Sequence, residues 1–162
     1  QLSLLYDVTH NICKVEKHMV EGREKLLYIH RKGATRAFPK GHPELPSIYK
    51  QTGHPVIIPG TMGTSSYVLV GTEKSLEETW GSTSHGAGRI MSRAQAIKEN
   101  KNRSIDSELA VQGILVKGVS RKGLVEEMPE AYKDIDEVIR VVEGAGLCRK
   151  IARMVPLAVI KG

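Results

Sequence analysis

The first regular pattern in the chain is a stripe of apolar residues at helical spacing. Asp7 can cap the start of a helix, and apolar positions recur after it every three or four residues, at Val8, Ile12, Val15 and Met19. The Glu21-Gly22 pair then breaks the pattern. We therefore predict an amphipathic helix from Asp7 to about residue 20, with His10 and Asn11 away from its apolar side.

Runs of strand-forming residues predict β-structure further along. The run Lys25–Arg31 predicts a buried strand that delivers the basic, glycine-containing segment His30–Arg36 into a loop, where it can bind an anion. The small polar segment Gly60–Ser66 predicts a loop whose amides converge on a phosphate, or equally a plain hairpin connection. Other strands are predicted at Pro55–Pro59, Ser65–Val70, Ile114–Val119 and Ile151–Ile160, the last interrupted by Pro156.

Helical patterns alternate irregularly with these strands. Helices are predicted at Leu76–Trp80, Gly88–Asn100, Ile105–Gln112 and Asp134–Glu143, the last stopped by Gly144 and Gly146. Three prolines and a glycine make Pro39–Pro46 irregular. Because no βαβ spacing and no internal repeat is present, the expected fold class is α+β, with mixed sheets and surrounding helices.

Composition limits the possible classes of protein. A chain of 162 residues with 40% hydrophobic residues is long enough for one domain with a real core. The two cysteines, Cys13 and Cys148, form no metal-binding or disulfide pattern, so a reducing, cytoplasmic setting is expected. No apolar run is long enough to span a bilayer. The chain opens in an apolar run, Leu2–Tyr6, without an initiator methionine, as a piece of a longer protein would.

The charge balance favours a polyanionic partner. The net charge is +6, and basic residues cluster at Lys98–Arg103, Lys117–Lys122 and Arg149–Arg153. A solvated basic surface is the plainer explanation, because acidic residues number 18. Aromatic residues make up only 4% of the chain, which argues against base stacking, so any nucleic acid would be held by its phosphates.

The stretch richest in residues that could react or bind a ligand is Gly81–Arg93. Gly86 and Gly88 remove side-chain bulk beside His85, so a ligand can approach the imidazole closely. If the helix begins at Gly88, Arg89 and Arg93 lie on one face, where two guanidinium groups and the helix N-terminus attract phosphate. A glycine-rich helix entry with a surface histidine and solvated arginines is an equal alternative on this pattern alone.

Other catalytic patterns are absent. The sequence has no P-loop, no Gly-x-Ser-x-Gly nucleophile motif and no His-Glu-x-x-His zinc motif. His85 differs from the other histidines because glycines and arginines surround it, as suits a nucleophile that attacks phosphorus. Attack requires a neutral imidazole, and nearby arginines would lower its pKa.

Five motifs in order give the chain a resemblance to a known family. They are Tyr6–Asn11, His30–Pro39, Pro59–Thr64, His85–Arg89 and Val159–Gly162. In these motifs the sequence resembles the C-terminal portion of RtcB-type RNA-splicing ligases, and the resemblance covers the whole chain. It implies one segment, residues 1–162, of a larger ligase catalytic domain.

The resemblance implies a GTP- and Mn²⁺-dependent RNA ligase. Such an enzyme joins a 2′,3′-cyclic phosphate or 3′-phosphate RNA end to a 5′-hydroxyl end through a histidine–guanylate, in tRNA splicing and RNA repair. By position, His85 would be the guanylylated histidine and His10 a manganese ligand. The implied nucleotide-binding residues are Asn11, Thr61, Ser66, Ala87, Gly88, Tyr132 and Lys161. Arg89, Arg93 and Lys32 would contact RNA or phosphate.

The resemblance also implies what this segment lacks. The family's other metal ligands and its guanine-reading acidic residue would lie upstream, and neither cysteine of the chain matches the family's metal-binding cysteine. The segment alone is therefore expected to be inactive. Its expected partners are RNA such as tRNA halves, GTP, the upstream portion of the ligase and an archease-type activating protein. The alternative from another class is a non-catalytic RNA-binding domain that only holds phosphates.

Overall fold

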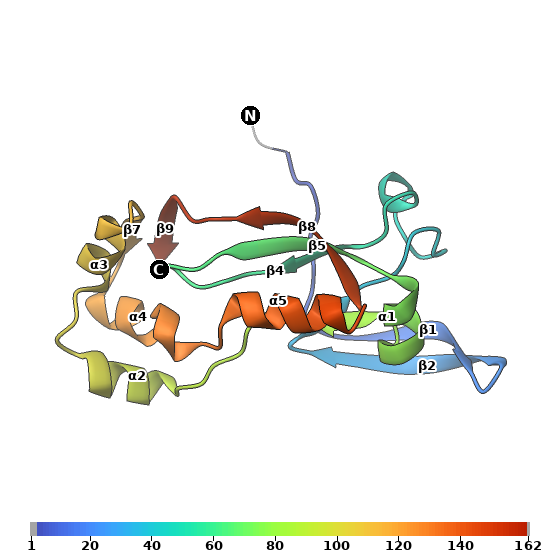
Figure 1. Cartoon of the computed structure of the whole chain (residues 1–162). Coiled ribbons are helices and arrows are strands. Elements are labelled where there is room, and N and C mark those ends of the chain that lie inside the picture. Colours follow the sequence, from blue (N-terminus) through green and yellow to red (C-terminus); the bar gives the residue numbers. More distant parts are fainter. Residues whose placement is uncertain (1–2, 162) are drawn as a thin grey trace.

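The computed structural model describes residues 3–161, which form a mixed α+β fold, as expected (Figure 1). Its strands are β1 (Asn11–Val20), β2 (Arg23–Lys32), β3 (Ala34–Arg36), β4 (Pro55–Ile58), β5 (Ser66–Gly71), β6 (Ser82–Ser84), β7 (Leu115–Gly118), β8 (Cys148–Met154) and β9 (Ala158–Lys161). Its helices are α1 (Glu73–Thr79), α2 (Arg93–Asn100), α3 (Ile105–Val111), α4 (Arg121–Glu126) and α5 (Ile135–Gly144), with short 3-10 turns at Ser47–Tyr49 and Pro129–Ala131.

One hydrophobic core lies between a three-stranded sheet and α5. The sheet has the order β4-β5-β8, with both neighbouring pairs antiparallel. Val56, Ile58 and Leu69 of the sheet pack against Ile139 and Val142 of α5. Removing these apolar side chains from water is what fixes α5 on the sheet.

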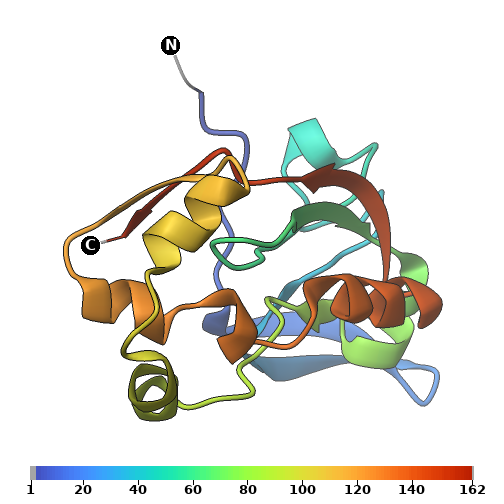
Figure 2. The ribbon, with the colours of Figure 1, turned by 60° about the vertical axis from the view of Figure 1, so that its left-hand side comes forward.

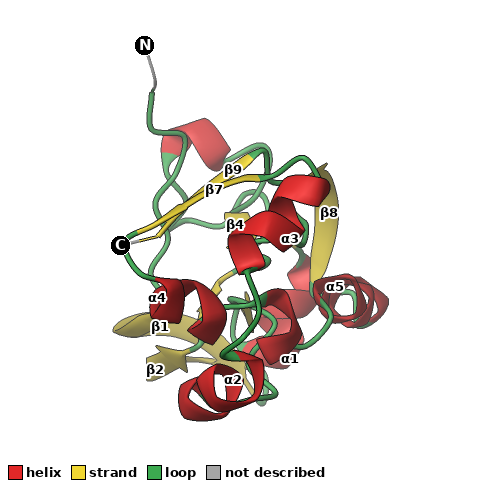
Figure 3. Cartoon of the chain, turned by 90° about the vertical axis from the view of Figure 1, so that its left-hand side faces the viewer, coloured by secondary structure: helices red, strands yellow, loops and turns green. Residues whose placement is uncertain are grey.

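A second core joins α2, α3 and α4 to the parallel pair β7 and β9. Ala96, Leu109, Leu124 and Val125 are buried in it, and Val159 of β9 packs against it. Figure 1 shows these elements together at its left-hand end, and Figures 2 and 3 turn this end toward the viewer. The pairing of β7 with β9 brings the last strand of the chain back to this helical end.

The predicted helix after Asp7 is wrong, because this segment forms β1, the first strand of an antiparallel hairpin with β2. Val15 and Met19 lie on the exposed face of the hairpin, while the opposite face buries Glu16 and His18. In this strand the buried positions carry charged and polar residues. The alternation typical of a strand therefore does not appear in the hydrophobic pattern, and the spacing of the apolar residues resembles that of a helix.

Glu16 is the centre of a buried ion-pair cluster. Arg31 donates two hydrogen bonds to its carboxylate at 2.7 and 2.8 Å, and Arg36 donates a third at 2.7 Å. His18 contacts the second carboxylate oxygen at 3.1 Å. Arg31 also donates to Ser82 Oγ at 2.8 Å and to the carbonyl oxygen of Trp80 at 2.9 Å. The cluster thus ties the hairpin to the segment that leads into β6.

Most other predicted elements are confirmed within one to three residues, with the following corrections. The predicted loop His30–Arg36 is the end of β2 and all of β3, which are joined at Gly33. The strand predicted at Lys25–Arg31 is present within β2, but it is not buried as a whole, because Leu26 and Tyr28 are exposed. The helix predicted from Gly88 begins only at Arg93, where Ser92 caps it by accepting from the amide of Gln95. The strand predicted at Ile151–Ile160 is two strands in different sheets, because Pro156 interrupts the run and the chain leaves the β5 edge to pair with β7. Helix α4 was not predicted.

We predict that Glu16→Gln destabilises the chain by about 3–5 kcal/mol, because it leaves Arg31 buried without its counter-charge. Glu24→Gln, which removes an exposed partner of Lys17 on the same hairpin, should cost far less. Urea unfolding at neutral pH measures both losses. Equal losses would contradict the assigned importance of the buried cluster.

The same cluster predicts a pH dependence of stability. Burial would raise the pKa of Glu16, but hydrogen bonds from Arg31, His18 and Arg36 and the charge of Arg31 outweigh it and lower this pKa from 4.5 to about 2. A lowered folded-state pKa stabilises the fold above pH 4.5, and the contribution disappears as the pH falls through the window from 4.5 to about 2. The stability difference between wild type and Glu16→Gln should therefore shrink across this window in a series of urea titrations.

Candidate functional site

Two short paired strands position His85. Strand β3 pairs antiparallel with β6, with Ala34 opposite Ser84, and His85 follows directly after β6. The ring of His85 stacks on the ring of His10, with the centroids 3.9 Å apart and the planes 1° from parallel. The structure therefore brings together two histidines that are 75 positions apart in the sequence, the proposed nucleophile and the proposed metal ligand.

The surroundings of His85 favour the neutral imidazole, although the physical cause differs from the expected one. Burial lowers the pKa of His85, and the nearby His10 lowers it further. The expectation that the neighbouring arginines lower this pKa was wrong, because Arg89 is directed to other partners. Nδ1 of His85 is buried and has no hydrogen-bond partner among the residues that the structure describes.

His85 lines a cavity of about 400 Å³ that lies where the two hydrophobic cores meet. Ala87, on one side of it, packs against the core of the three-stranded sheet, whereas Met62, Tyr132 and Val159 belong to the helical end. Six residues that the sequence resemblance assigned to the site line this one cavity: Thr61, His85, Ala87, Gly88, Tyr132 and Lys161.

The loop between β4 and β5 forms one wall of the cavity. The amide of Gly60 donates to Ser66 Oγ at 3.0 Å, and the amide of Thr61 donates to Thr64 Oγ1 at 2.7 Å. Both amides are thus paired inside the loop. A side chain at Gly60 would collide with the Ser65 carbonyl, which explains the glycine. Ser66 shapes this wall through the Gly60 bond and does not itself line the cavity.

Arg89 and Arg93 do not share a helix face as expected, because α2 begins at Arg93 and Arg89 lies before it. Arg89 is largely buried, with a side-chain exposure of 22%, and all its donor groups have protein partners. It donates to Met91 O at 2.9 Å, to Tyr132 Oη at 2.9 Å and to Glu126 O at 2.6 Å. Arg93 has a side-chain exposure of 64% and a single carboxylate partner. Arg93 is therefore the more available of the two for a ligand phosphate.

Glu127 is a site residue that the sequence reasoning missed. It lines the cavity beside Lys161, accepts a hydrogen bond from Tyr132 Oη and another from Arg93 at 3.0 Å, and lies 3.4 Å from Arg89. Burial would raise the pKa of Glu127, but these hydrogen bonds and the charges of Arg89 and Lys161 lower it. Nothing local marks this residue, since it follows a helix that was not predicted and both of its arginine partners are more than thirty positions away in the sequence.

Two more of the assigned residues lie outside the cavity lining. Asn11 and Lys32 face each other as the residue pair at the open end of the β1–β2 hairpin, and both are exposed. Asn11 is next to His10, so this end of the hairpin lies near the histidine pair. Neither residue is part of the lining of the cavity described above.

The donor atoms of this chain do not by themselves make a metal centre. Across residues 3–161, no three side chains of the histidine, cysteine, aspartate or glutamate type are grouped closely enough to hold a metal ion. His10 supplies one imidazole near the cavity, and Cys13 contacts His30 on the exposed hairpin face, at 3.5 Å. A manganese ion would need ligands beyond this set.

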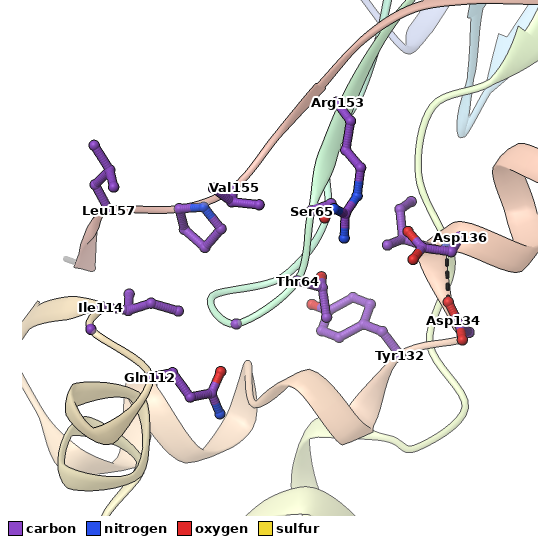
Figure 4. A pocket seen from close by; sticks show the side chains of 14 residues that line it. Thr64, Ser65, Gln112, Ile114, Tyr132, Asp134, Asp136, Arg153, Val155 and Leu157 are labelled. Atoms are coloured by element: carbon purple, nitrogen blue, oxygen red, sulfur yellow. Dashed lines mark hydrogen bonds between the residues drawn. The ribbon is translucent and has the colours of Figure 1, made fainter.

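A larger cavity of about 650 Å³ is lined in part by Tyr132 and by the turn at Gly63–Ser65 (Figure 4). Asp134, Asp136 and Arg153 line it, so it mixes both charges. It shares Tyr132 with the set assigned from the sequence, whereas His85 lines only the smaller cavity. No helix in the described part of the chain is long and apolar enough to cross a membrane.

Comparison with known proteins gives a consistent result. The model of the family described as "tRNA-splicing ligase RtcB" matches residues 1–162. The chain is 49% identical to the tRNA-splicing ligase RtcB of Thermococcus kodakarensis, covering 100% of the chain and 34% of that protein. It is 52% identical to the RNA-splicing ligase RtcB of Mycobacterium bovis, over 99% of the chain and 37% of that protein. With the tRNA-splicing ligase RtcB of Pyrococcus abyssi the identity is also 52%, over 99% of the chain and 18% of the relative.

The contacts of the two arginines predict different effects on stability. Arg89→Lys should destabilise the chain by about 2 kcal/mol, because an ammonium group cannot replace three directed guanidinium hydrogen bonds. Arg93→Lys should leave the unfolding midpoint unchanged within error, since its side chain is exposed. Thermal unfolding of both variants measures the difference, and a larger loss for Arg93→Lys would refute the assignment.

Proposed function

The chain belongs to the RtcB family of tRNA-splicing ligases, and we propose that it is the C-terminal, nucleotide-accepting part of an RNA ligase. The proposed reaction joins an RNA 2′,3′-cyclic phosphate or 3′-phosphate to a 5′-hydroxyl, in tRNA splicing and RNA repair. The observation that carries the proposal is the cavity of about 400 Å³, because it gathers His85 and five further residues that the sequence resemblance assigned to nucleotide binding.

In the proposed first step, His85 attacks GTP. An unprotonated ring nitrogen of His85 forms a bond to the α-phosphorus, and the bond to the leaving pyrophosphate breaks. Because Nδ1 is buried, Nε2 is the nitrogen that can reach the cavity. The lowered pKa of His85 supports this role, since a protonated imidazole has no lone pair to donate.

In the later steps, the guanylyl group passes to the RNA. The RNA 3′-phosphate takes the guanylyl group from His85, and the 5′-hydroxyl oxygen then attacks that phosphate and releases GMP. Arg93 supports this proposal as an exposed cation beside the cavity. Lys32, exposed at the end of the hairpin, is a second proposed phosphate contact.

The nucleotide itself is proposed to lie among Tyr132, Lys161 and the loop that begins at Gly60. Glu127 supports this arrangement, because it accepts a hydrogen bond from the Tyr132 hydroxyl and its pKa responds to the charge of Lys161. One carboxylate thus holds the tyrosine and balances the lysine. Asn11, beside His10, is proposed as a further nucleotide contact outside the cavity lining.

Manganese is proposed as the metal of the complete enzyme, with His10 as one of its ligands. When bound, a divalent metal supplies charge neutralisation for the phosphates. This chain contributes an imidazole whose ring is held parallel to that of His85. The remaining ligands are proposed to come from outside the chain.

The proposed partner is the remainder of the same ligase, in the cytoplasm, together with an archease-type activating protein. The chain spans between 18% and 37% of the length of the relatives compared above. One face of the β1–β2 hairpin exposes an apolar set that a neighbouring surface could cover: Val15, Met19, Leu26 and Tyr28.

The proposal predicts that His85→Ala in the complete ligase abolishes covalent labelling by α-radiolabelled GTP, because the attacking nitrogen is lost. His30→Ala, which removes an exposed histidine outside the cavity, should keep the label. Denaturing gel electrophoresis after incubation with Mn²⁺ measures the label. Label retained on the His85 variant would exclude this nucleophile, and RNA binding without any label would favour the phosphate-holding RNA-binding domain.

The incomplete donor set predicts that residues 1–162 alone take up no label from GTP and Mn²⁺. Addition of the upstream portion as a separate polypeptide should restore labelling at His85, because it would complete the metal site. The same gel assay, with peptide mapping of the labelled residue, measures this. Labelling of the isolated segment would contradict the proposed division of the site.

A further inference from the structure

Gly33 connects the backbones of the two stacked histidines. Its amide donates a hydrogen bond to the carbonyl oxygen of His10 at 2.9 Å, and its carbonyl oxygen accepts one from the amide of His85 at 3.2 Å. The imidazole rings of these two histidines are parallel, and their centroids are 3.9 Å apart. A single residue therefore sets the spacing of both histidine backbones.

From this geometry we propose that Gly33 is a positioning residue that holds His10 and His85 as a stacked pair in the productive arrangement for guanylylation. The inference rests on the proposed function of His85 and adds to it a residue without reactive chemistry. Gly33 acts through its backbone alone, so it would act on the reaction only by fixing where the two rings lie.

The glycine is required by the backbone conformation and not by lack of space. Gly33 has φ +66°, in the left-handed region, and a Cβ at this position would meet nothing within 4 Å. This conformation costs an L-residue about 1–2 kcal/mol. Asparagine tolerates it better than most other residues, while a β-branched residue such as valine is an outlier there.

Both sides of Gly33 are anchored, so a strained residue cannot relax without moving a histidine. On one side Lys32 closes the hairpin opposite Asn11, next to His10. On the other side Ala34 pairs with Ser84, next to His85. A change of φ at Gly33 therefore shifts the His10 side against the His85 side. Displacing an attacking imidazole by about 1 Å from its position toward the substrate can slow the reaction about a hundredfold.

The chain contains a matched control for backbone strain. Gly22, in the turn at the far end of the same hairpin, has φ +75°, and a Cβ there would also meet nothing within 4 Å. Gly22→Val should thus carry a similar strain without touching either histidine. Gly33→Asn tests whether a residue that tolerates the left-handed region rescues the site.

The experiment measures single-turnover guanylylation in the complete ligase at saturating GTP and Mn²⁺. We expect Gly33→Val to slow labelling about a hundredfold, with the apparent GTP affinity within about threefold of wild type, because Tyr132, Lys161 and the loop that begins at Gly60 are left in place. Gly33→Asn should label at a rate near that of wild type. Gly22→Val should also label normally, although its unfolding temperature falls as much as that of Gly33→Val. If Gly33→Val does not fold, Gly33→Ala replaces it, with Gly22→Ala as its control.

Equal labelling rates for the Gly33 and Gly22 variants would overturn the inference while leaving the role of His85 intact. Slow labelling by Gly33→Asn, equal to that of Gly33→Val, would also overturn it, because backbone conformation would then not be the cause. Absence of label on His85 in the wild-type ligase would instead be a failure of the proposed function. The two failures are therefore distinguishable in one assay.

Discussion

The buried pairing of Glu16 with Arg31 is the interaction on which the arrangement of this chain depends. Taking these charges out of water is costly, and the cost is offset only because the carboxylate accepts two hydrogen bonds from Arg31 and a third from Arg36. Arg31 also reaches Ser82 and the Trp80 carbonyl. The same guanidinium thus ties the hairpin to the segment that leads to His85.

The cavity itself depends on a different constraint, the meeting of two hydrophobic cores. One core holds Ala87 and the other holds Tyr132 and Val159, and the small cavity lies between them. Glu127 joins Tyr132 to Arg93 on the helical side of the cavity. The cavity walls therefore come from two separately packed parts of the chain, with Ala87 on one side and Tyr132 and Val159 on the other.

The hydrophobic pattern predicted secondary structure most reliably where the buried side chains are apolar, and it failed where they are polar. The strands around Val56 and Leu69 and the helix around Ile139 were predicted within a few residues, because their buried faces are apolar. Strand β1 was predicted as a helix because its buried face carries Glu16 and His18. The delayed start of α2 at Arg93 has a local cause, since Ser92 provides the cap and has an extended backbone.

By itself the sequence determined the α+β class, the membership of the family and the residue types of the candidate site, because periodicity and ordered motifs are local properties of the chain. Only the tertiary structure decided that His10 stacks on His85, that Arg89 is committed to Tyr132 while Arg93 is exposed, and that Glu127 belongs to the cavity. These pairs are far apart in the chain, and their contacts depend on how the hairpin and the two cores pack, which no local pattern encodes.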